Sequence, residues 1–332
     1  MKTLKFGILG CGMIANIHAE AIKNVEGAEL IGAADARRES AEKFAEKYGV
    51  KAYSSFEEML ADKEIGAVCV CTPSFLHAEN AIQALKAGKH VALEKPMALN
   101  TADADEIIRT CEETGKKLTV ISQLRFSDDI NKVKKLVEEG AFGKITLGDL
   151  YMKYYRSEEY YSSSAWKGKL AFDGGGALMN QGIHGVDLLT YILGDVKKVS
   201  GEIRTLSHKI EVEDTAAAVV EFENGALGVI EASTCAYPGF DRKIEIHGDK
   251  GYAVIKEDKI ERLMINGKKS GTEEEKAKAA TSSDPSALSC ALHARQLGNF
   301  VKAIDGKEKL IIDAEEGRKA VAIIRKIYGD EQ

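Results

Sequence analysis

The first 120 residues of the chain alternate short apolar runs with longer segments in which apolar residues recur every three to four positions. A short apolar run predicts a buried strand, and the longer spacing predicts an amphipathic helix. We expect strands at Leu4–Leu9, Glu29–Ala34, Ala67–Thr72, His90–Leu93 and Leu118–Ser122. We expect helices at Met13–Lys23, Glu39–Tyr48, Leu76–Ala87 and Thr101–Thr114, and a short one after a capping box at Ser55. This alternation predicts an α/β domain with a doubly wound parallel sheet.

The pattern changes after residue 122, where strands follow one another directly. They are expected at Val196–Thr205, Thr215–Phe222, Ala226–Thr234, Lys243–His247, Tyr252–Ile255 and Glu261–Ile265. Helices are expected at Asp129–Glu139, Ala177–Leu193, His293–Asp305 and Glu315–Tyr328. Such an order predicts an α+β domain with an open, mostly antiparallel sheet. We therefore expect two domains, residues 1–122 and 123–332, with an exposed loop at Gly271–Ser289.

A glycine-rich turn joins the first predicted strand to the first predicted helix. Gly10, Gly12 and Ala15 fit the pattern G-x-G-x-x-A. The first glycine permits a tight turn, the second lets the backbone approach a pyrophosphate, and the small alanine allows close packing of the helix. The backbone N–H groups at the helix start, at Met13 and Ile14, would face the phosphates. The turn therefore predicts a dinucleotide-binding Rossmann domain.

Asp35 ends the second predicted strand, where a carboxylate can accept both hydroxyls of the adenosine ribose. Its charge would repel a 2′-phosphate, so the expected cofactor is NAD. Arg37 and Arg38 keep NADP as the less favoured alternative, because an arginine near this position can pair with that phosphate.

Further polar residues follow the later strands of the parallel sheet. Thr72, Pro73 and His77 come after one strand, and Lys95 comes after the next. Ligands of doubly wound sheets bind at this edge, so we expect cofactor contacts from all four residues. The Lys95 ammonium is suited to holding a substrate hydroxyl and stabilising a developing alkoxide. The alternatives are a surface lysine at 95 and a helix-capping histidine at 77.

A second group of polar residues lies on the helix predicted at Ala177–Leu193. Asn180, His184 and Asp187 are spaced i, i+4, i+7 and therefore share one helix face. An ordinary surface helix also has one polar face. The histidine favours function, because its pKa suits proton transfer near neutral pH.

Three motifs in this order resemble the Gfo/Idh/MocA family of nicotinamide-dependent sugar and cyclitol oxidoreductases. They are GxGxxA near residue 10, AGKHVxxEKP at 87–96 and GGGxLxxxGxHxxD at 174–187. The resemblance implies a Rossmann domain followed by an open-faced sheet domain. It implies that Lys95 is the active-site lysine, that His184 is the catalytic histidine, and that Glu94 and Gln123 line the nicotinamide side.

The chain departs from the family pattern at Asn180, where members commonly carry an acid. An asparagine amide can hydrogen-bond a substrate hydroxyl, but it cannot accept a proton and pass it on. His184 is then expected to release its proton to water, to Asp187 or by another route.

Other side chains are expected to bind the substrate. Tyr161 and Trp166 lie in an aromatic segment on which a sugar ring can stack, and Arg125 is a candidate for an anionic substituent. With Asn180 and Asp187 they complete the expected substrate-binding set. Cys69 and Cys71 lie inside an apolar strand and form no zinc-ligand set, so no metal is expected.

Charge and composition exclude some classes of binding partner. The 46 basic and 52 acidic residues give a net charge of −6, which offers no broad surface for nucleic acid or an anionic membrane. The chain shows no apolar span of membrane length and no signal region, so we expect a cytoplasmic protein. An open sheet face would expose apolar side chains unless another subunit covered it, which predicts a homodimer or homotetramer.

The leading hypothesis is an oxidoreductase that moves a hydride between NAD and a ring carbon of a sugar, sugar derivative or cyclitol. Two alternatives come from relatives with this fold. One is an NAD-dependent glycosidase that uses transient oxidation, and the other is a non-catalytic regulator that senses a sugar or dinucleotide.

Overall fold

The computed structural model describes residues 3–164, 166–269 and 289–330, so the loop expected at Gly271–Ser289 lies outside the described residues except for Ser289. The chain divides into two compact units. The first contains residues 1–123 and 288–319, and the second contains residues 124–287 and 320–332. The segment 288–319 thus joins the unit of the N-terminal sheet. Within the described ranges, no helix is long and apolar enough to cross a membrane.

The first unit is built on a six-stranded sheet whose neighbouring strands are all parallel. The strand order is β3-β2-β1-β4-β5-β6. The bounds are β1 Leu4–Leu9, β2 Ala28–Ala34, β3 Lys51–Ala52, β4 Ala67–Val70, β5 His90–Leu93 and β6 Leu118–Val120. The order reverses between β1 and β4, and ligands of such sheets bind at the carboxyl ends of the strands beside this reversal. The expected doubly wound parallel sheet is confirmed.

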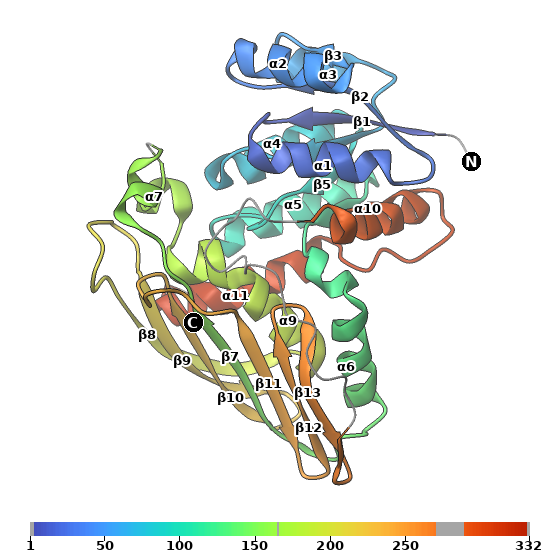
Figure 1. Ribbon diagram of the computed structural model, residues 1–332. Coiled ribbons are helices and arrows are strands. Elements are labelled where there is room, and N and C mark those ends of the chain that lie inside the picture. Colours follow the sequence, from blue (N-terminus) through green and yellow to red (C-terminus); the bar gives the residue numbers. More distant parts are fainter. Residues whose placement is uncertain (1–2, 165, 270–288, 331–332) are drawn as a thin grey trace. The chain divides into compact units, whose positions relative to one another are not determined.

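The helices of this unit follow the strands in sequence (Figure 1). They are α1 Met13–Lys23, α2 Arg38–Tyr48, α3 Phe56–Ala61, η1 Ser74–Leu76, α4 His77–Lys86, α5 Thr101–Thr114, and, from the C-terminal segment, α10 Ala291–Ile304. Helix α10 packs against α1. Its Phe300 ring lies 6.5 Å from the ring of Phe6 in β1, and both side chains are fully buried. The C-terminal segment therefore completes the core beneath the glycine-rich turn.

The second unit contains an eight-stranded sheet of order β14-β13-β12-β11-β7-β10-β9-β8. Its bounds are β7 Ile145–Lys153, β8 Val196–Arg204, β9 Thr215–Phe222, β10 Leu227–Ser233, β11 Lys243–Gly248, β12 Gly251–Lys256, β13 Lys259–Ile265 and β14 Lys268–Lys269. Strands β7 and β10 pair in parallel, and the remaining neighbours in the described sheet pair antiparallel. This confirms the mostly antiparallel second sheet.

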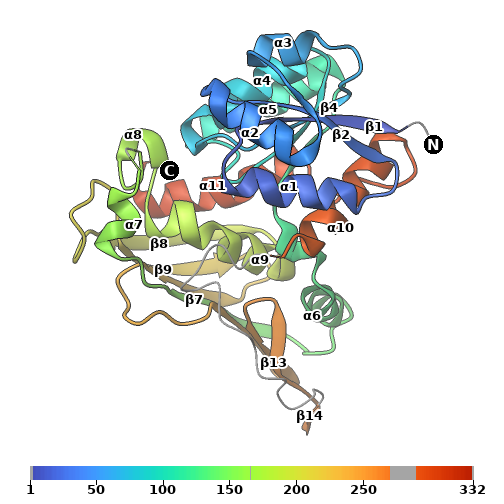
Figure 2. The same ribbon diagram turned by 45° about the horizontal axis from the view of Figure 1, so that its top comes forward.

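Helix α9 lies along one face of this sheet (Figure 2). The unit's helical segments are η2 Gln123–Phe126, α6 Asp128–Glu138, α7 Glu158–Ser162, α8 Leu170–Asp173, the π-turn η3 Ala177–Gly182, α9 Ile183–Leu193, and the end of α11 Ala314–Tyr328. Gly148 of β7 permits the close approach of α9, because a Cβ there would collide with the Leu193 side chain. The opposite face carries exposed Leu147, Val219 and Leu227.

Two sequence-based expectations need correction. Strand β7 was not among the expected strands, although it lies in the middle of the second sheet. The helix expected at Ala177–Leu193 is not one α-helix, because its first part is the π-turn η3. Its N–H groups bind tertiary partners: Leu178 donates to the Glu213 carboxylate at 2.8 Å, and Met179 donates to the Tyr328 hydroxyl at 3.2 Å.

Candidate active site

The glycine-rich turn between β1 and α1 has the geometry of a phosphate-binding loop. Gly10 has φ +87°, and a Cβ there would lie 2.7 Å from the Cys71 carbonyl oxygen, so only glycine fits. A Cβ on Gly12, the N-cap of α1, would meet nothing within 4 Å. The first turn of α1 contains no acidic side chain. Its N-terminus is therefore an open, electropositive end suited to a pyrophosphate.

Asp35 lies beside this turn at the end of β2. Its Oδ2 accepts a hydrogen bond from the Cys11 N–H at 2.8 Å, and its Oδ1 accepts one from the Arg37 N–H at 2.8 Å. The carboxylate is thereby held where ribose hydroxyls can reach it. The Arg38 side chain pairs with Glu42, and Met13, exposed by 56%, adds an apolar surface beside the loop.

The loops after β4 and β5 are joined by His77. Its buried ring has Nε2 2.8 Å from the Thr72 carbonyl oxygen and Nδ1 2.6 Å from the Pro96 carbonyl oxygen. Burial lowers the pKa of this imidazole. Thr72 and Pro73 are half-buried at the same edge. His77 therefore lies between the two loops that carry the expected cofactor and catalytic residues, and in its neutral form it donates its single N–H to one of these two carbonyls.

Glu94 and Lys95 follow β5 and differ in burial. Glu94 is buried, and its Oε1 lies 2.8 Å from Nε2 of His18 in α1. Its Oε2 accepts a hydrogen bond from the Lys95 main-chain N–H at 3.3 Å. Lys95 is half-buried. Gln123 is buried just beyond β6, and its Oε1 has no hydrogen-bond partner among the described residues.

His184 lies in the first turn of α9 and is half-buried. Asn180, in the π-turn before it, donates from Nδ2 to Oδ1 of Asp173 at 3.2 Å. Its Oδ1 accepts a hydrogen bond from Gln181 Nε2 at 3.2 Å. Asp173 is buried and also accepts the Gly168 N–H at 2.6 Å. The amide of Asn180 is therefore oriented by a neighbouring carboxylate.

Arg125 and Asp187 bind each other in this structure. Arg125 Nη2 lies 2.7 Å from Asp187 Oδ1, Arg125 Nε lies 2.9 Å from Asp187 Oδ2, and both residues are buried. The Arg125 guanidinium also lies 4.8 Å from the centre of the Tyr191 ring. The pair joins η2 to α9, and it fixes the helix that carries His184.

The aromatic segment expected to bind substrate contains a buried arginine. Arg156 donates from Nη2 to the Gln181 side-chain oxygen at 3.0 Å, and its guanidinium lies 5.5 Å from the Tyr160 ring centre. Lys167 Nζ lies 4.1 Å from the same ring centre. Tyr161 and Trp166 are half-buried nearby in the chain. The second unit thus has two cations against one aromatic ring.

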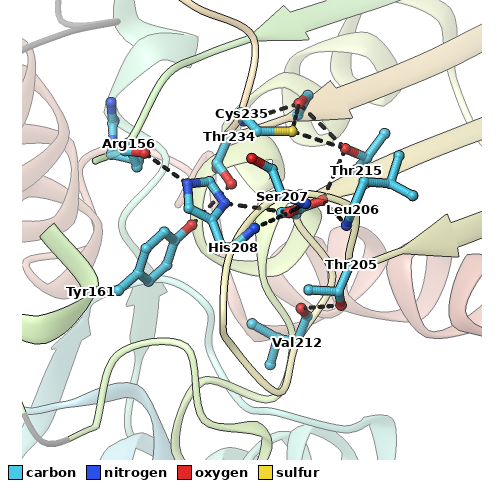
Figure 3. Close-up of polar contacts among 12 residues, drawn as sticks. Arg156, Tyr161, Thr205, Leu206, Ser207, His208, Val212, Thr215, Thr234 and Cys235 are labelled. Carbon is cyan, nitrogen blue, oxygen red and sulfur yellow. Dashed lines mark hydrogen bonds and ion pairs between the residues drawn. The ribbon is translucent and has the colours of Figure 1, made fainter. Parts of the chain in front are cut away.

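The loop between β8 and β9 supports this segment (Figure 3). His208 Nε2 lies 2.8 Å from the Arg156 carbonyl oxygen, and its ring centre lies 4.8 Å from that of Tyr161. The Tyr161 hydroxyl donates to Thr234 Oγ1 at 2.9 Å. Asp214, which is fully buried, accepts N–H groups from the loop residues Leu206, Ser207 and His208. The loop therefore has a fixed shape next to the expected substrate residues.

Several of these residues escaped sequence reasoning. The Tyr328 hydroxyl donates to Glu213 at 2.7 Å, and His293 Nε2 lies 3.9 Å from Glu94 Oε1. These contacts join residues far apart in the sequence, and no local pattern distinguishes Glu213, Tyr328 and His293 from ordinary polar positions. His18 offered a weak signal, since a histidine in the apolar stripe of α1 needs a buried partner.

Comparisons with known proteins show the family and the fold of the chain. Residues 4–122 match a model described as an oxidoreductase family with an NAD-binding Rossmann fold, and residues 130–254 match the Gfo/Idh/MocA C-terminal domain. Myo-inositol 2-dehydrogenase of Thermotoga maritima is 34% identical over 262 residues, which are 75% of this chain and 74% of the relative. D-glucoside 3-dehydrogenase of Escherichia coli is 27% identical over 98% of this chain and 94% of the relative.

A solved structure is similar over nearly the whole chain. It is the WlbA dehydrogenase from Bordetella pertussis in complex with NADH and UDP-GlcNAcA. It is 31% identical, covers 99% of this chain and 96% of its own, and has a TM-score of 0.87.

Proposed function

The chain belongs to the Gfo/Idh/MocA family of NAD-binding oxidoreductases, and from this we propose that it moves a hydride between NAD and a ring carbon of a sugar, sugar derivative or cyclitol. The observation that carries the proposal is the open N-terminus of α1 beside a fixed Asp35 carboxylate. The relatives named above are dehydrogenases. The two alternatives, an NAD-dependent glycosidase and a non-catalytic regulator, are therefore not favoured.

The residues of the first unit fit NAD. The N–H groups after Gly12 would hold the pyrophosphate, and Asp35 would accept the adenosine ribose hydroxyls. The loop residues Thr72 and Pro73 would line the cofactor, with His77 holding their backbone in place. When bound, NAD supplies the acceptor for the hydride.

Two side chains carry the proton chemistry in this proposal. In the oxidation direction, an imidazole nitrogen of His184 accepts the proton of the substrate hydroxyl while the carbon loses its hydride. The Lys95 ammonium donates a hydrogen bond to the same oxygen and stabilises its developing negative charge. Asn180 holds a substrate hydroxyl through its amide, and the Arg125–Asp187 pair keeps α9 in place.

Replacing His184 tests this assignment. We expect His184→Ala to lower kcat by about 10²- to 10⁴-fold while the Kd for NADH changes little, because only proton transfer is lost. The measurement combines nicotinamide absorbance with NADH titration. His247→Gln in β11 is the matched control and should keep full activity. A His184→Ala enzyme that turns over normally would refute the role.

The cations of the second unit favour an anionic sugar derivative over an uncharged cyclitol. Arg156 and Lys167 both lie against the Tyr160 ring. Of the nearby carboxylates, Asp173 accepts hydrogen bonds from Gly168 and Asn180, and Asp214 accepts the N–H groups of the β8–β9 loop. The Bordetella relative is bound to UDP-GlcNAcA. We expect Lys167→Met to raise KM for a nucleotide-linked uronic acid by about tenfold and to leave KM for myo-inositol unchanged. Equal effects on both substrates would contradict the anionic class.

A second copy of the chain is the proposed partner of the open sheet face. Leu147, Val219 and Leu227 lie on this face and are exposed by 44%, 58% and 51%. Neighbouring apolar side chains of this kind are typical of an interface between subunits. We therefore propose a homodimer or homotetramer assembled through this sheet.

A further inference from the structure

A buried cluster of three polar side chains lies in the first unit beside the start of the Lys95 loop. His18 comes from α1, Glu94 follows β5, and His293 comes from α10. Their exposed fractions are 0%, 6% and 1%. Glu94 Oε1 lies 2.8 Å from His18 Nε2 and 3.9 Å from His293 Nε2. The proposed reaction does not use His18 or His293, so the cluster requires its own explanation.

The Glu94 carboxylate is an ionised group in the protein interior. Burial opposes its ionisation, but the hydrogen bond with His18 and the positive charges of His18 and Lys95 outweigh burial and lower its pKa to about 2. Burial also lowers the pKa of His293 to about 4. A buried carboxylate requires hydrogen-bond donors, and the shortest contact here is the one with His18. His18 therefore sets the orientation of the carboxylate.

The orientation of the Glu94 carboxylate affects the Lys95 loop through a main-chain hydrogen bond. The other carboxylate oxygen, Oε2, accepts the N–H of Lys95. On the far side of Lys95, the Pro96 carbonyl is held by the buried ring of His77. The backbone that carries the Lys95 side chain is thus held before and after that residue.

Helix α1 connects the cluster to the cofactor loop. Its N-terminus follows Gly12, and His18 lies in the same helix. One rigid element therefore presents N–H groups for the pyrophosphate and an imidazole for Glu94. A shift of α1 would therefore move both groups together.

The spacing of the three side chains fits hydrogen bonding better than metal binding. A zinc ion is held at about 2.0–2.2 Å by each ligand, and a tetrahedral set has four of them. Only three candidate ligand atoms gather here among the described residues, all within 4.8 Å of one another, so a tetrahedral set would lack a fourth protein ligand. A distance of 2.8 Å between His18 and Glu94 is that of a direct hydrogen bond.

We propose that His18 is a positioning residue for Lys95, acting through the Glu94 carboxylate. The proposal rests on the proposed role of Lys95 in the reaction. His293 closes the cluster from α10, so the C-terminal segment also supports the loop.

The test compares two substitutions of His18 in the full-length enzyme. His18→Met removes the donor at similar volume, and we expect kcat to fall about 10- to 100-fold with little change in the Kd for NADH, as displacement of a catalytic group does. His18→Gln keeps an N–H donor and should restore most of kcat. His90→Gln, at the opposite end of β5, is the matched control and should behave as wild type.

A double variant with Lys95→Ala distinguishes a positioning role of His18 from a nonspecific loss of structure. In Lys95→Ala enzyme, His18→Met should lower kcat no further, because residues that act through one another are not additive. If His18→Met does not fold, His18→Met/Glu94→Met removes the buried charge together with its partner and should show the same loss of kcat. A folded variant with unchanged kcat, or a further loss in the Lys95→Ala background, would overturn the proposal.

Metal analysis provides an independent outcome. A stoichiometric metal ion that disappears in His18→Met would show that the cluster is a metal site and would also overturn the proposal. Normal turnover by Lys95→Ala itself would refute the proposed role of Lys95. A defective Lys95→Ala with an active His18→Met would refute only the positioning role of His18.

Discussion

At the scale of single residues, neighbouring glycines in one loop have different reasons to be glycine. Gly10 has a positive φ and lies against the Cys71 carbonyl, so the fold of the protein alone, without any ligand, requires glycine there. Gly12 has open space around its Cα, and its constraint arises only when a pyrophosphate approaches. The two positions should therefore respond differently to the same substitution.

We expect Gly10→Ala to destabilise the protein by about 2 kcal/mol or more, because the backbone is left-handed and the methyl group meets a carbonyl oxygen. Gly12→Ala should leave stability nearly unchanged but weaken NADH binding by about tenfold or more, since the methyl group occupies phosphate space. Urea unfolding and NADH titration of both variants check this. Equal destabilisation of the two would contradict it.

His293 makes stability sensitive to acid. Its pKa in the folded protein is lowered to about 4 by burial and the charge of His18, below the unfolded value of about 6.5. The unfolded chain therefore takes up a proton between these values before the folded chain does. Stability should fall as pH decreases from about 6.5 to 4, by up to roughly 1.4 kcal/mol per pH unit for this group.

Urea unfolding at pH 7.5, 6.5, 5.5 and 4.5 measures this slope. His293→Gln should flatten it, because the variant has no group to titrate at this position. A slope identical in variant and wild type would show that His293 does not contribute.

At the scale of elements, the π-turn η3 depends on a carboxylate from a distant strand connection. Glu213 is buried and accepts the N–H groups of Gly176 and Leu178 and the hydroxyl of Tyr328. Burial raises the pKa of Glu213. These contacts hold the start of the helical segment that carries His184.

We expect Tyr328→Phe to destabilise the protein by about 1–3 kcal/mol, because the buried carboxylate and the Met179 N–H each lose a partner. Urea unfolding measures the loss, and kcat should fall as well if η3 positions His184. Tyr237→Phe is the control, since Tyr237 is 77% exposed. Equal stability of the two variants would contradict a role for this contact.

For the whole molecule, the C-terminal part of the chain contributes to both units: residues 288–319 belong to the first and residues 320–332 to the second. Helix α11 begins in the first unit and ends in the second, with the division after Lys319. The family match and the relatives cover both the Rossmann unit and the sheet unit. In our proposal the sheet unit also forms the interface with a second copy of the chain.

A charge in the open face should disrupt that assembly. We expect Val219→Glu to shift the protein to monomers at micromolar concentration, because the substitution buries a carboxylate at the proposed interface. Sedimentation velocity measures the state. Lys86→Glu on α4 changes the charge in the first unit and should leave assembly intact. A wild-type monomer, or an unchanged Val219→Glu oligomer, would refute the proposal.

Local sequence patterns predicted most strands and helices of the parallel-sheet unit and the glycine-rich turn, but they missed β7. Apolar spacing is a local property, so the boundaries of β1, α1 and α5 were predicted without error, and the glycine turn with Asp35 indicated NAD. Tertiary structure alone decided the π-turn and the supporting polar contacts. The partners of Glu94, Asp187 and Glu213 lie 76, 62 and 115 residues away. Spacing along the chain cannot reveal such pairs. A buried polar group needs a hydrogen-bond partner, and the tertiary fold can bring that partner from any part of the sequence.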